Sequence, residues 1–316
     1  MLTQKFVSYL MVLLFGSVLL IGCKEMGTES VQTPETTTEK MALEKIAQED
    51  SSLVSFEKNY DEQGGLDFSL GKTAEQIFPV RVVRRVTNVT RNFDANIIGD
   101  TSYVTATLTF TGNLFIAASY DSVALGDSSA VDTIIVKPFS STVVRKLIFS
   151  KVANTRNPEH NWKLIAISLP DGGTVTQNIK IQKMTISLPN DTLVITSPND
   201  YYLSRGLGKM QQIPLLNRNQ RVTIYVEIFS KYDDEDFVTL TFGADIRGIN
   251  RVKRKLTLES SIPVSDGFVK TFKHTFLTQP FPGHSHAIVS AMPKQVVFDD
   301  QAPVECKSWG IPYFVR

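Results

Sequence analysis

The stretch at residues 88–110, NVTRNFDANIIGDTSYVTATLTF, decides the fold class. In the first half of this stretch, every second side chain lies on the same face of an extended chain. These residues are Val89, Arg91, Phe93, Ala95 and Ile97. After a turn at residues 99–100, apolar and polar side chains alternate again as far as residue 110. Two such runs on either side of a short polar turn predict an antiparallel hairpin with one buried face.

The segments around this hairpin predict a helix packed on a larger sheet. Residues 41–60 carry apolar side chains interspersed with Glu and Lys, which predicts an amphipathic helix or two short ones. Residues 142–152 and 162–169 predict two further strands. A Ser- and Asp-rich excursion at residues 118–137 predicts an exposed loop or hairpin tip, and Asp-Gly-Gly at residues 171–173 predicts the end of the unit.

The chain after residue 173 predicts strands only, separated by turns at short intervals. Such spacing is typical of a β-sandwich. The predicted strands are residues 178–188, 192–195, 221–230, 237–242, 251–259, 268–277, 286–291, 295–298 and 310–315.

Two fold resemblances follow from this order of elements. Residues 41–173 resemble the cystatin-like or ketosteroid-isomerase-like cone, in which a helix lies on a curved antiparallel sheet. Residues 174–316 resemble an immunoglobulin-like β-sandwich in architecture, although they lack the Cys and Trp spacing of true immunoglobulin domains. We therefore expect a mainly β chain, with an α+β first domain followed by a β-sandwich domain. Neither resemblance carries a functional residue over to this chain.

The composition excludes several classes of protein. The chain has 316 residues, with 33 Lys and Arg against 32 Asp and Glu, so a net charge of +1 gives no reason to expect a nucleic-acid partner. The content of apolar residues, 42%, is too high for a disordered chain. Two cysteines exclude a disulfide-stapled scaffold.

The N-terminus predicts export. Lys5 is followed by residues 6–22, which carry no charge and end in Leu20-Ile21-Gly22-Cys23. These last four residues resemble the bacterial lipobox. The resemblance implies that residues 1–22 are a signal peptide removed before Cys23, whose thiol receives a diacylglyceryl group. An uncleaved membrane anchor and ordinary cleavage without lipid are the alternatives.

A lipidated Cys23 would place the protein in the bacterial cell envelope. Residues 23–40 are polar and rich in Thr and Glu, which predicts a disordered tether between the lipid and the folded body. The expected partners are the membrane, through the acyl chains, and an envelope protein or glycan. The sequence leaves open which membrane and which face.

The candidate metal ligands are few. His284 and His286 lie two residues apart, so on a strand they share a face, and His274, Asp299 or Asp300 would have to complete a zinc site. The alternative is a polar turn after residues 281–283, Phe-Pro-Gly. We expect no metal or other cofactor: the sequence favours the polar turn over a zinc site, and no P-loop or dinucleotide fingerprint appears in it.

Cys306 is the sole thiol that remains once Cys23 is lipidated. A nucleophilic cysteine needs a nearby histidine, which His284 or His286 would supply, and the alternative is a buried inert thiol. No nucleophile-elbow motif appears either. The sequence therefore favours a binding or structural module without catalysis. The alternative is a small-ligand binder, or an enzyme, that uses the concave face of the first sheet or the His284/His286 region.

Overall fold

The structure is a computed structural model. It describes residues 34–50, 53, 56–57, 60, 66–67, 77–121, 131–188, 191–204, 213–244 and 251–316. Contacts divide the chain into two units, Met1–Glu39 and Lys40–Arg316. The signal peptide, Cys23 and most of the expected tether lie outside the described residues.

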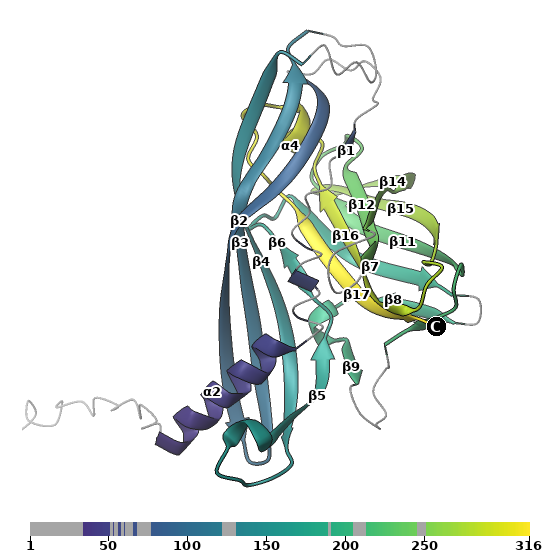
Figure 1. The fold of residues 1–316 in the computed structure, drawn as a ribbon. Coiled ribbons are helices and arrows are strands. Elements are labelled where there is room, and N and C mark those ends of the chain that lie inside the picture. The colour runs from purple at the N-terminus through teal and green to yellow at the C-terminus, as the bar shows by residue number, and fades with distance from the viewer. Residues whose placement is uncertain are drawn as a thin grey trace, which may run out of the picture. The chain divides into compact units, whose positions relative to one another are not determined.

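The larger unit contains three long strands: β2 (Phe78–Ile98), β3 (Thr101–Ser119) and β4 (Thr133–Lys151) (Figure 1). They pair in sequence order and antiparallel, which confirms the hairpin expected from residues 88–110. Each strand runs further than its predicted segment, so the expected excursion at residues 118–137 shortens to the residues between β3 and β4.

These strands have two distinct faces. On β3 the face here called the inner face carries Val104, Ala106, Leu108 and Phe110, all of which are at most 2% exposed. The opposite face, called the outer face, carries threonines that are only partly buried, at residues 105, 107, 109 and 111. Alternation of buried and partly exposed residues is what a sheet covered on one side requires.

Helical residues cover part of the inner face. Helix α2 (Pro34–Glu49) begins earlier than the predicted segment, and its Leu43 and Ala47 side chains are fully buried. Beyond α2, Leu53, Phe56 and Tyr60 are also helical and buried. All five side chains belong to the core that includes the inner face, so the predicted amphipathic character is confirmed. The helix begins at Pro34, however, and not at residue 41 as predicted.

Most strands join one sheet. Among the described residues it has 12 strands, and its main path runs β1-β2-β3-β4-β6-β17-β16-β12-β13, with β10 on β17 and β5 linking β4 to β9. Besides β2, β3 and β4, its strands are β1 (Leu66–Asp67), β5 (Trp162–Ser168), β6 (Asp171–Gly173), β9 (Tyr202–Ser204), β10 (Leu215–Leu216), β12 (Phe237–Ala244), β13 (Val252–Lys255), β16 (Gly283–Met292) and β17 (Lys307–Val315).

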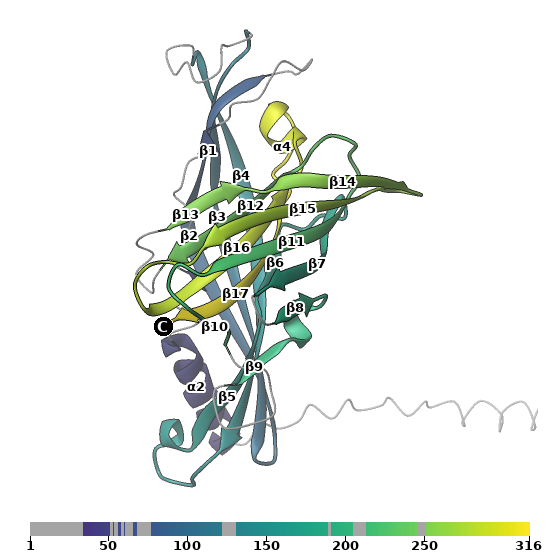
Figure 2. The same ribbon diagram turned by 90° about the vertical axis from the view of Figure 1, so that its right-hand side faces the viewer.

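A second sheet completes a sandwich with the C-terminal strands. Its order is β14-β15-β11-β7-β8, and Figure 2 shows it in front of β16 and β17. Val226 of β11 and Phe272 of β15 share one core with Leu240 of β12 and Ile311 of β17. The strands are β7 (Ile179–Ser187), β8 (Thr192–Ile195), β11 (Arg221–Ser230), β14 (Thr257–Val264) and β15 (Gly267–Leu277). The chain is therefore mainly β, with a helix on an antiparallel sheet and a sandwich.

The Asp-Gly-Gly segment forms a strand, where we expected it to end a unit. This strand, β6, pairs with β4 on one side and with β17 on the other. A Cβ atom on Gly172 would lie 2.6 Å from Val143 Cγ2, and one on Gly173, whose φ is +142°, would lie 2.2 Å from the Cys306 carbonyl oxygen. Glycine is needed because two backbones flank this strand closely. The two expected domains thus meet within one sheet.

Two further predictions were wrong in detail. Residues 295–298 form a short helix, α4 (Gln295–Phe298), because Val296, Val297 and Phe298 all fill a small core and a short apolar run does not distinguish strand from helix. Residues 251–259 form two strands, β13 and β14, which belong to different sheets. Leu256, 1% exposed, anchors the crossover between them.

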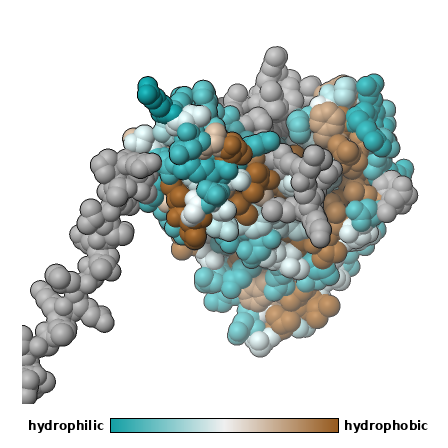
Figure 3. Space-filling model, turned by 90° about the horizontal axis from the view of Figure 1, so that it is seen from below, coloured by the Kyte–Doolittle hydropathy of each residue, from teal (hydrophilic) through white to brown (hydrophobic). Residues whose placement is uncertain are grey.

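Two 3-10 helices, η2 (Pro158–His160) and η3 (Pro198–Asp200), lie on either side of β5 and β6 in the sequence. Within the part of the chain that the structure describes, every helix is too short or too polar to cross a membrane. Seen from below Figure 1, the surface shows separate hydrophobic patches between polar residues (Figure 3).

Candidate functional site

Aromatic rings pack on part of the inner face. Phe56 stacks on Tyr60, with ring centroids 5.5 Å apart, and Tyr60 lies tilted against Phe110, with centroids 4.6 Å apart. Leu147 and Phe149 of β4 are fully buried beside them in the same core. A small-ligand site on this concave face is therefore restricted to the space that these side chains leave.

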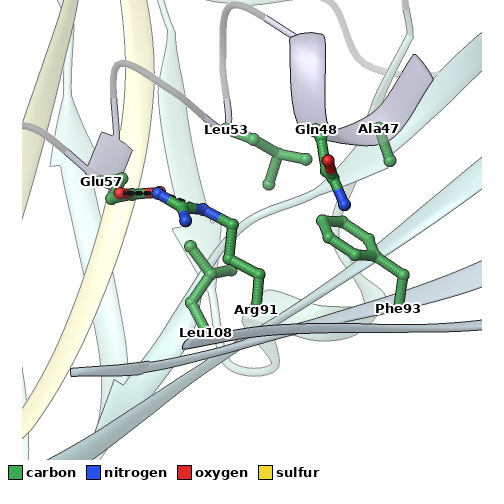
Figure 4. A pocket seen from close by; sticks show the side chains of 7 residues that line it. All are labelled: Ala47, Gln48, Leu53, Glu57, Arg91, Phe93 and Leu108. Carbon is green, nitrogen blue, oxygen red and sulfur yellow. Dashed lines mark hydrogen bonds and ion pairs between the residues drawn. The ribbon is translucent and has the colours of Figure 1, made fainter. Parts of the chain in front are cut away.

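A pocket lies at the edge of this packing, between α2 and strands β2 and β3 (Figure 4). Its volume is about 290 Å³, close to the lower end of the range for small-molecule sites. It is lined by Ala47, Gln48, Leu53, Glu57, Arg91, Phe93 and Leu108. We call it the Arg91 pocket.

Strand geometry positions the charged wall of the Arg91 pocket. Arg91 pairs with Leu108 in the β2–β3 register, so its side chain leaves the sheet on the inner face between two apolar neighbours on β2, Val89 and Phe93. Its Nε atom donates a hydrogen bond to Glu57 Oε2 at 2.9 Å, and its Nη2 atom donates to Glu57 Oε1. This paired, bidentate geometry is the strong form of an arginine–carboxylate contact.

The pair remains accessible from solvent. The Arg91 side chain is 44% exposed and the Glu57 side chain is 20% exposed. Gln48 adds a neutral amide to the same wall, while Leu53, Phe93 and Leu108 supply apolar contact area. The arrangement can recognise a small molecule that has one charged end and one apolar end, because both kinds of surface converge on one space.

Three other cations on the inner face are committed to structure. The Arg84 guanidinium lies over the rings of Tyr60 and Phe139, 4.7 and 4.3 Å from their centroids. The Arg145 side chain is fully buried, and its Nε atom donates to the Ser168 carbonyl oxygen at 3.0 Å. Unlike these side chains, the Arg91 side chain borders a pocket that a ligand can enter.

Lys137 is the third of these cations. Its Nζ atom donates to three backbone carbonyl oxygens around α4: those of Val296 and Ala302, both at 2.8 Å, and that of Asp299. Burial lowers the pKa of Lys137, which nearby Asp299 and Asp300 partly oppose. This ammonium group holds together the loop that follows α4.

The two histidines considered as candidate metal ligands lie in different environments. His286 is 4% exposed and its ring meets Phe56 edge-on, with centroids 6.0 Å apart. His284 is exposed and lies edge-on to Phe314, with centroids 4.9 Å apart. His274 lies on β15 in the other sheet, and burial lowers its pKa, with a smaller effect from Arg254.

The acidic candidates have structural contacts of their own. Asp299 Oδ1 accepts hydrogen bonds from the backbone N–H groups of Gln301 and Ala302, which fixes the turn after α4. Asp300 accepts a long hydrogen bond from the Tyr120 hydroxyl, at 3.5 Å. Over the described ranges, no three His, Cys, Asp or Glu side chains come together as a metal site would need.

Cys306 is 3% exposed, and its backbone N–H donates to Thr174 Oγ1 at 3.0 Å. Its burial fits the inert alternative better than a nucleophile that a substrate must reach. Cys23, the lipidation candidate, lies outside the described residues.

Arg91 was visible in the sequence as the one charged residue on the apolar face of residues 89–97, yet that pattern alone did not mark it as a site. The signal is a charge at a position that the strand period assigns to the core. Glu57 gave no such signal, because it lies among the exposed charges of a predicted amphipathic helix.

Comparisons with known proteins assign no family to this chain. No family model matches this chain, and no curated protein matches it. Among solved structures, the C-terminal domain of wzt is similar over 47% of this chain and 78% of its own length, with 15% sequence identity and a TM-score of 0.29.

Proposed function

We propose that this chain is a lipid-anchored protein of the bacterial cell envelope that binds a small apolar carboxylate, without turnover, in the Arg91 pocket. The lipobox-like residues Leu20-Ile21-Gly22-Cys23 support the anchor. Two or three acyl chains on Cys23, at about 0.8 kcal/mol for each buried methylene, suffice for stable attachment where one chain does not.

The observation that carries the ligand class is the bidentate contact between Arg91 and Glu57 at the wall of an apolar pocket. Glu57 shows that the Arg91 guanidinium can hold a planar carboxylate from the side that faces the pocket. A ligand carboxylate has the same shape and charge, so it can take the place of Glu57 while Glu57 turns to solvent.

Such an exchange costs little in hydrogen bonding, because one carboxylate replaces another on the same guanidinium. The net affinity then comes from the apolar part of the ligand, at about 25 cal/mol for each Å² of apolar surface removed from water. Leu53, Phe93 and Leu108 provide that surface. A compact ring or short chain fits a volume of about 290 Å³.

A trio of probes of nearly equal shape tests the charge preference. Benzoate, benzamide and benzamidinium differ at the polar end alone, and isothermal titration calorimetry with the full-length chain in detergent measures their affinities. We expect benzoate to bind at least about tenfold more tightly than benzamide: both offer the same ring, but an amide that displaces Glu57 gives up a hydrogen bond to a charged group, worth about 1.5–3 kcal/mol, that a carboxylate restores. Benzamidinium as the tightest of the three would overturn the carboxylate assignment.

Two substitutions test the site itself. Arg91→Gln should abolish the preference for benzoate, whereas Arg85→Gln, an exposed arginine on the outer face of the same strand, should leave it unchanged. Glu57→Gln should tighten benzoate binding, because the ligand then no longer competes with a side-chain carboxylate. Equal benzoate affinity in all four proteins would rule out the Arg91 pocket.

The anchor has its own test. Mass spectrometry of the N-terminal peptide from native membranes should show Cys23 as the first residue, carrying acyl chains. An unmodified peptide that contains Leu20 to Cys23 would contradict the lipid anchor and leave the pocket proposal standing.

A further inference from the structure

A second candidate binding surface lies on the outer face, at the end of β3 that follows the β2–β3 turn. In the strand register, Asn96, Tyr103 and Ile148 form one row across β2, β3 and β4. Asp94 and Thr105 begin the next row. Tyr103 is 48% exposed, so its ring is available to a ligand on the side of the sheet opposite the Arg91 pocket.

Lys146 completes the second row, and an ion pair fixes its side chain. The Lys146 Nζ atom lies 3.0 Å from Asp200 Oδ1, and the two side chains are 43% and 68% exposed. Asp200 is held in turn by the Ser197 hydroxyl, which donates to its Oδ2 atom at 2.6 Å. The ammonium group and the carboxylate therefore keep defined positions on an open surface.

A second tyrosine lies on the far side of this ion pair. The backbone N–H of Lys146 donates to Ser168 Oγ at 2.8 Å, and Ser168 pairs with Tyr202 of β9. Tyr202 therefore continues the row that Thr105 and Lys146 form, two strands beyond Lys146. Burial raises the pKa of Tyr202, and Lys146 opposes this. We call Asp94, Asn96, Tyr103, Lys146, Asp200 and Tyr202 the two-tyrosine patch.

The charges of this patch select the chemistry of its ligand. Two carboxylates, Asp94 and Asp200, are balanced by two ammonium groups: Lys146, which pairs with Asp200, and the exposed Lys163, which pairs with Ser150 one row beyond the patch on the sheet. The outer face therefore has no net charge here that would attract a polyanion such as a nucleic acid or an acidic glycan. Thr and Asn side chains beside these charges offer neutral hydroxyl and amide groups.

We propose that the two-tyrosine patch binds a neutral glycan, with sugar rings lying against Tyr103 and Tyr202 and sugar hydroxyls bonding to Asn96, Asp94 and Asp200. A pyranose ring has an apolar face of C–H groups and a rim of hydroxyl groups, and an exposed tyrosine offers a flat apolar face beside a polar tip. Sugar hydroxyls both donate and accept, which suits a patch that mixes carboxylates, an amide and an ammonium group. This site is independent of the Arg91 pocket.

The test uses the full-length chain in a detergent without a sugar headgroup. Calorimetry with cellohexaose, maltohexaose and chitohexaose should show saturable binding of at least one of them, and a trigalacturonate probe should bind more weakly. Failure of all three neutral oligosaccharides, or tighter binding of trigalacturonate, would overturn the proposal. Benzoate affinity in the same samples reports separately on the Arg91 pocket.

Matched tyrosine variants locate the site. Tyr103→Ala and Tyr202→Ala should each weaken binding of the best oligosaccharide by about tenfold. Tyr103→Phe keeps the ring and should retain most of the affinity. Tyr120→Ala, which removes another exposed tyrosine directly after β3, at 56% exposure, is the control and should have no effect. Oligosaccharide binding that survives both alanine variants in folded protein would contradict this assignment.

Discussion

Lys270 and Asp236 form an ion pair in which both side chains are fully buried. The Nζ atom lies 2.8 Å from Asp236 Oδ2, and each side chain is 0% exposed. The same ammonium group donates to the carbonyl oxygens of Tyr232 and Asp234, while the Ser230 hydroxyl donates to Asp236 Oδ1. These contacts tie the turn between β11 and β12 to strand β15 and so fix one end of the sandwich.

Removing one member of this pair should destabilise the protein strongly. Asp236→Asn leaves a buried ammonium group without its counter-charge, which costs about 3–5 kcal/mol. The control is Glu235→Gln, which breaks the exposed Lys255–Glu235 ion pair and should cost less than about 1 kcal/mol. Urea unfolding of the two variants measures both values. Similar losses of unfolding free energy in the two variants would contradict a larger contribution to stability from the buried Lys270–Asp236 pair.

Gly173 should tolerate no side chain. In Gly173→Ala the new Cβ atom would lie 2.2 Å from the Cys306 carbonyl oxygen, so β6 would have to separate from β17. Gly99→Ala is the matched control, because Gly99 has φ +59° with nothing within 4 Å of the new atom. It should cost only about 1–2 kcal/mol of backbone strain. The midpoint of thermal unfolding of Gly173→Ala should lie well below that of Gly99→Ala. The reverse order of the two midpoints would contradict the role of β6 as the strand that joins β4 to β17.

Tyr313 should make the protein sensitive to alkali. Burial raises its pKa to about 12, and its hydroxyl donates to Gln279 Oε1 at 3.2 Å. In the unfolded chain the pKa of tyrosine is about 10, so above that pH the unfolded state releases a proton that the folded state keeps. Stability from this group is complete below pH about 10 and falls by about 1.4 kcal/mol for each pH unit up to about 12.

Tyr313→Phe removes this pH-dependent contribution to stability. The free energy of unfolding, measured in urea near pH 9 and pH 11, should therefore fall less with pH in the variant than in the unchanged protein. Parallel pH profiles for the two proteins would show that Tyr313 ionises equally in the folded and unfolded states.

The sequence predicted the elements whose pattern is local. Alternation over residues 88–110 predicted the β2–β3 hairpin and its buried face correctly, because one covered side of a strand imposes a period of two. The β8 and β11 strands also fall on the predicted residues. A turn of polar or glycine residues on each side bounds such strands in the sequence itself.

The errors arise where distant residues decide the local structure. Gly172 and Gly173 read as a turn, but β4 and β17 approach from both sides and make them a strand. Val296 and Val297 favour a strand by propensity, yet burial against Ile77 and Phe237 selects a helix. The partner of Arg91 could not be predicted either, because the burial of Leu53, Phe56 and Tyr60 on the inner face brings Glu57 to it.

The most direct measurement of the central claim is a crystal structure of the full-length chain with 4-bromobenzoate, whose bromine gives an anomalous signal. We predict a bromine peak against Phe93 and Leu108 and a carboxylate on the Arg91 guanidinium, with Glu57 displaced toward solvent. A saturated crystal in which Glu57 still holds Arg91, with the bromine elsewhere or absent, would contradict the proposed ligand site.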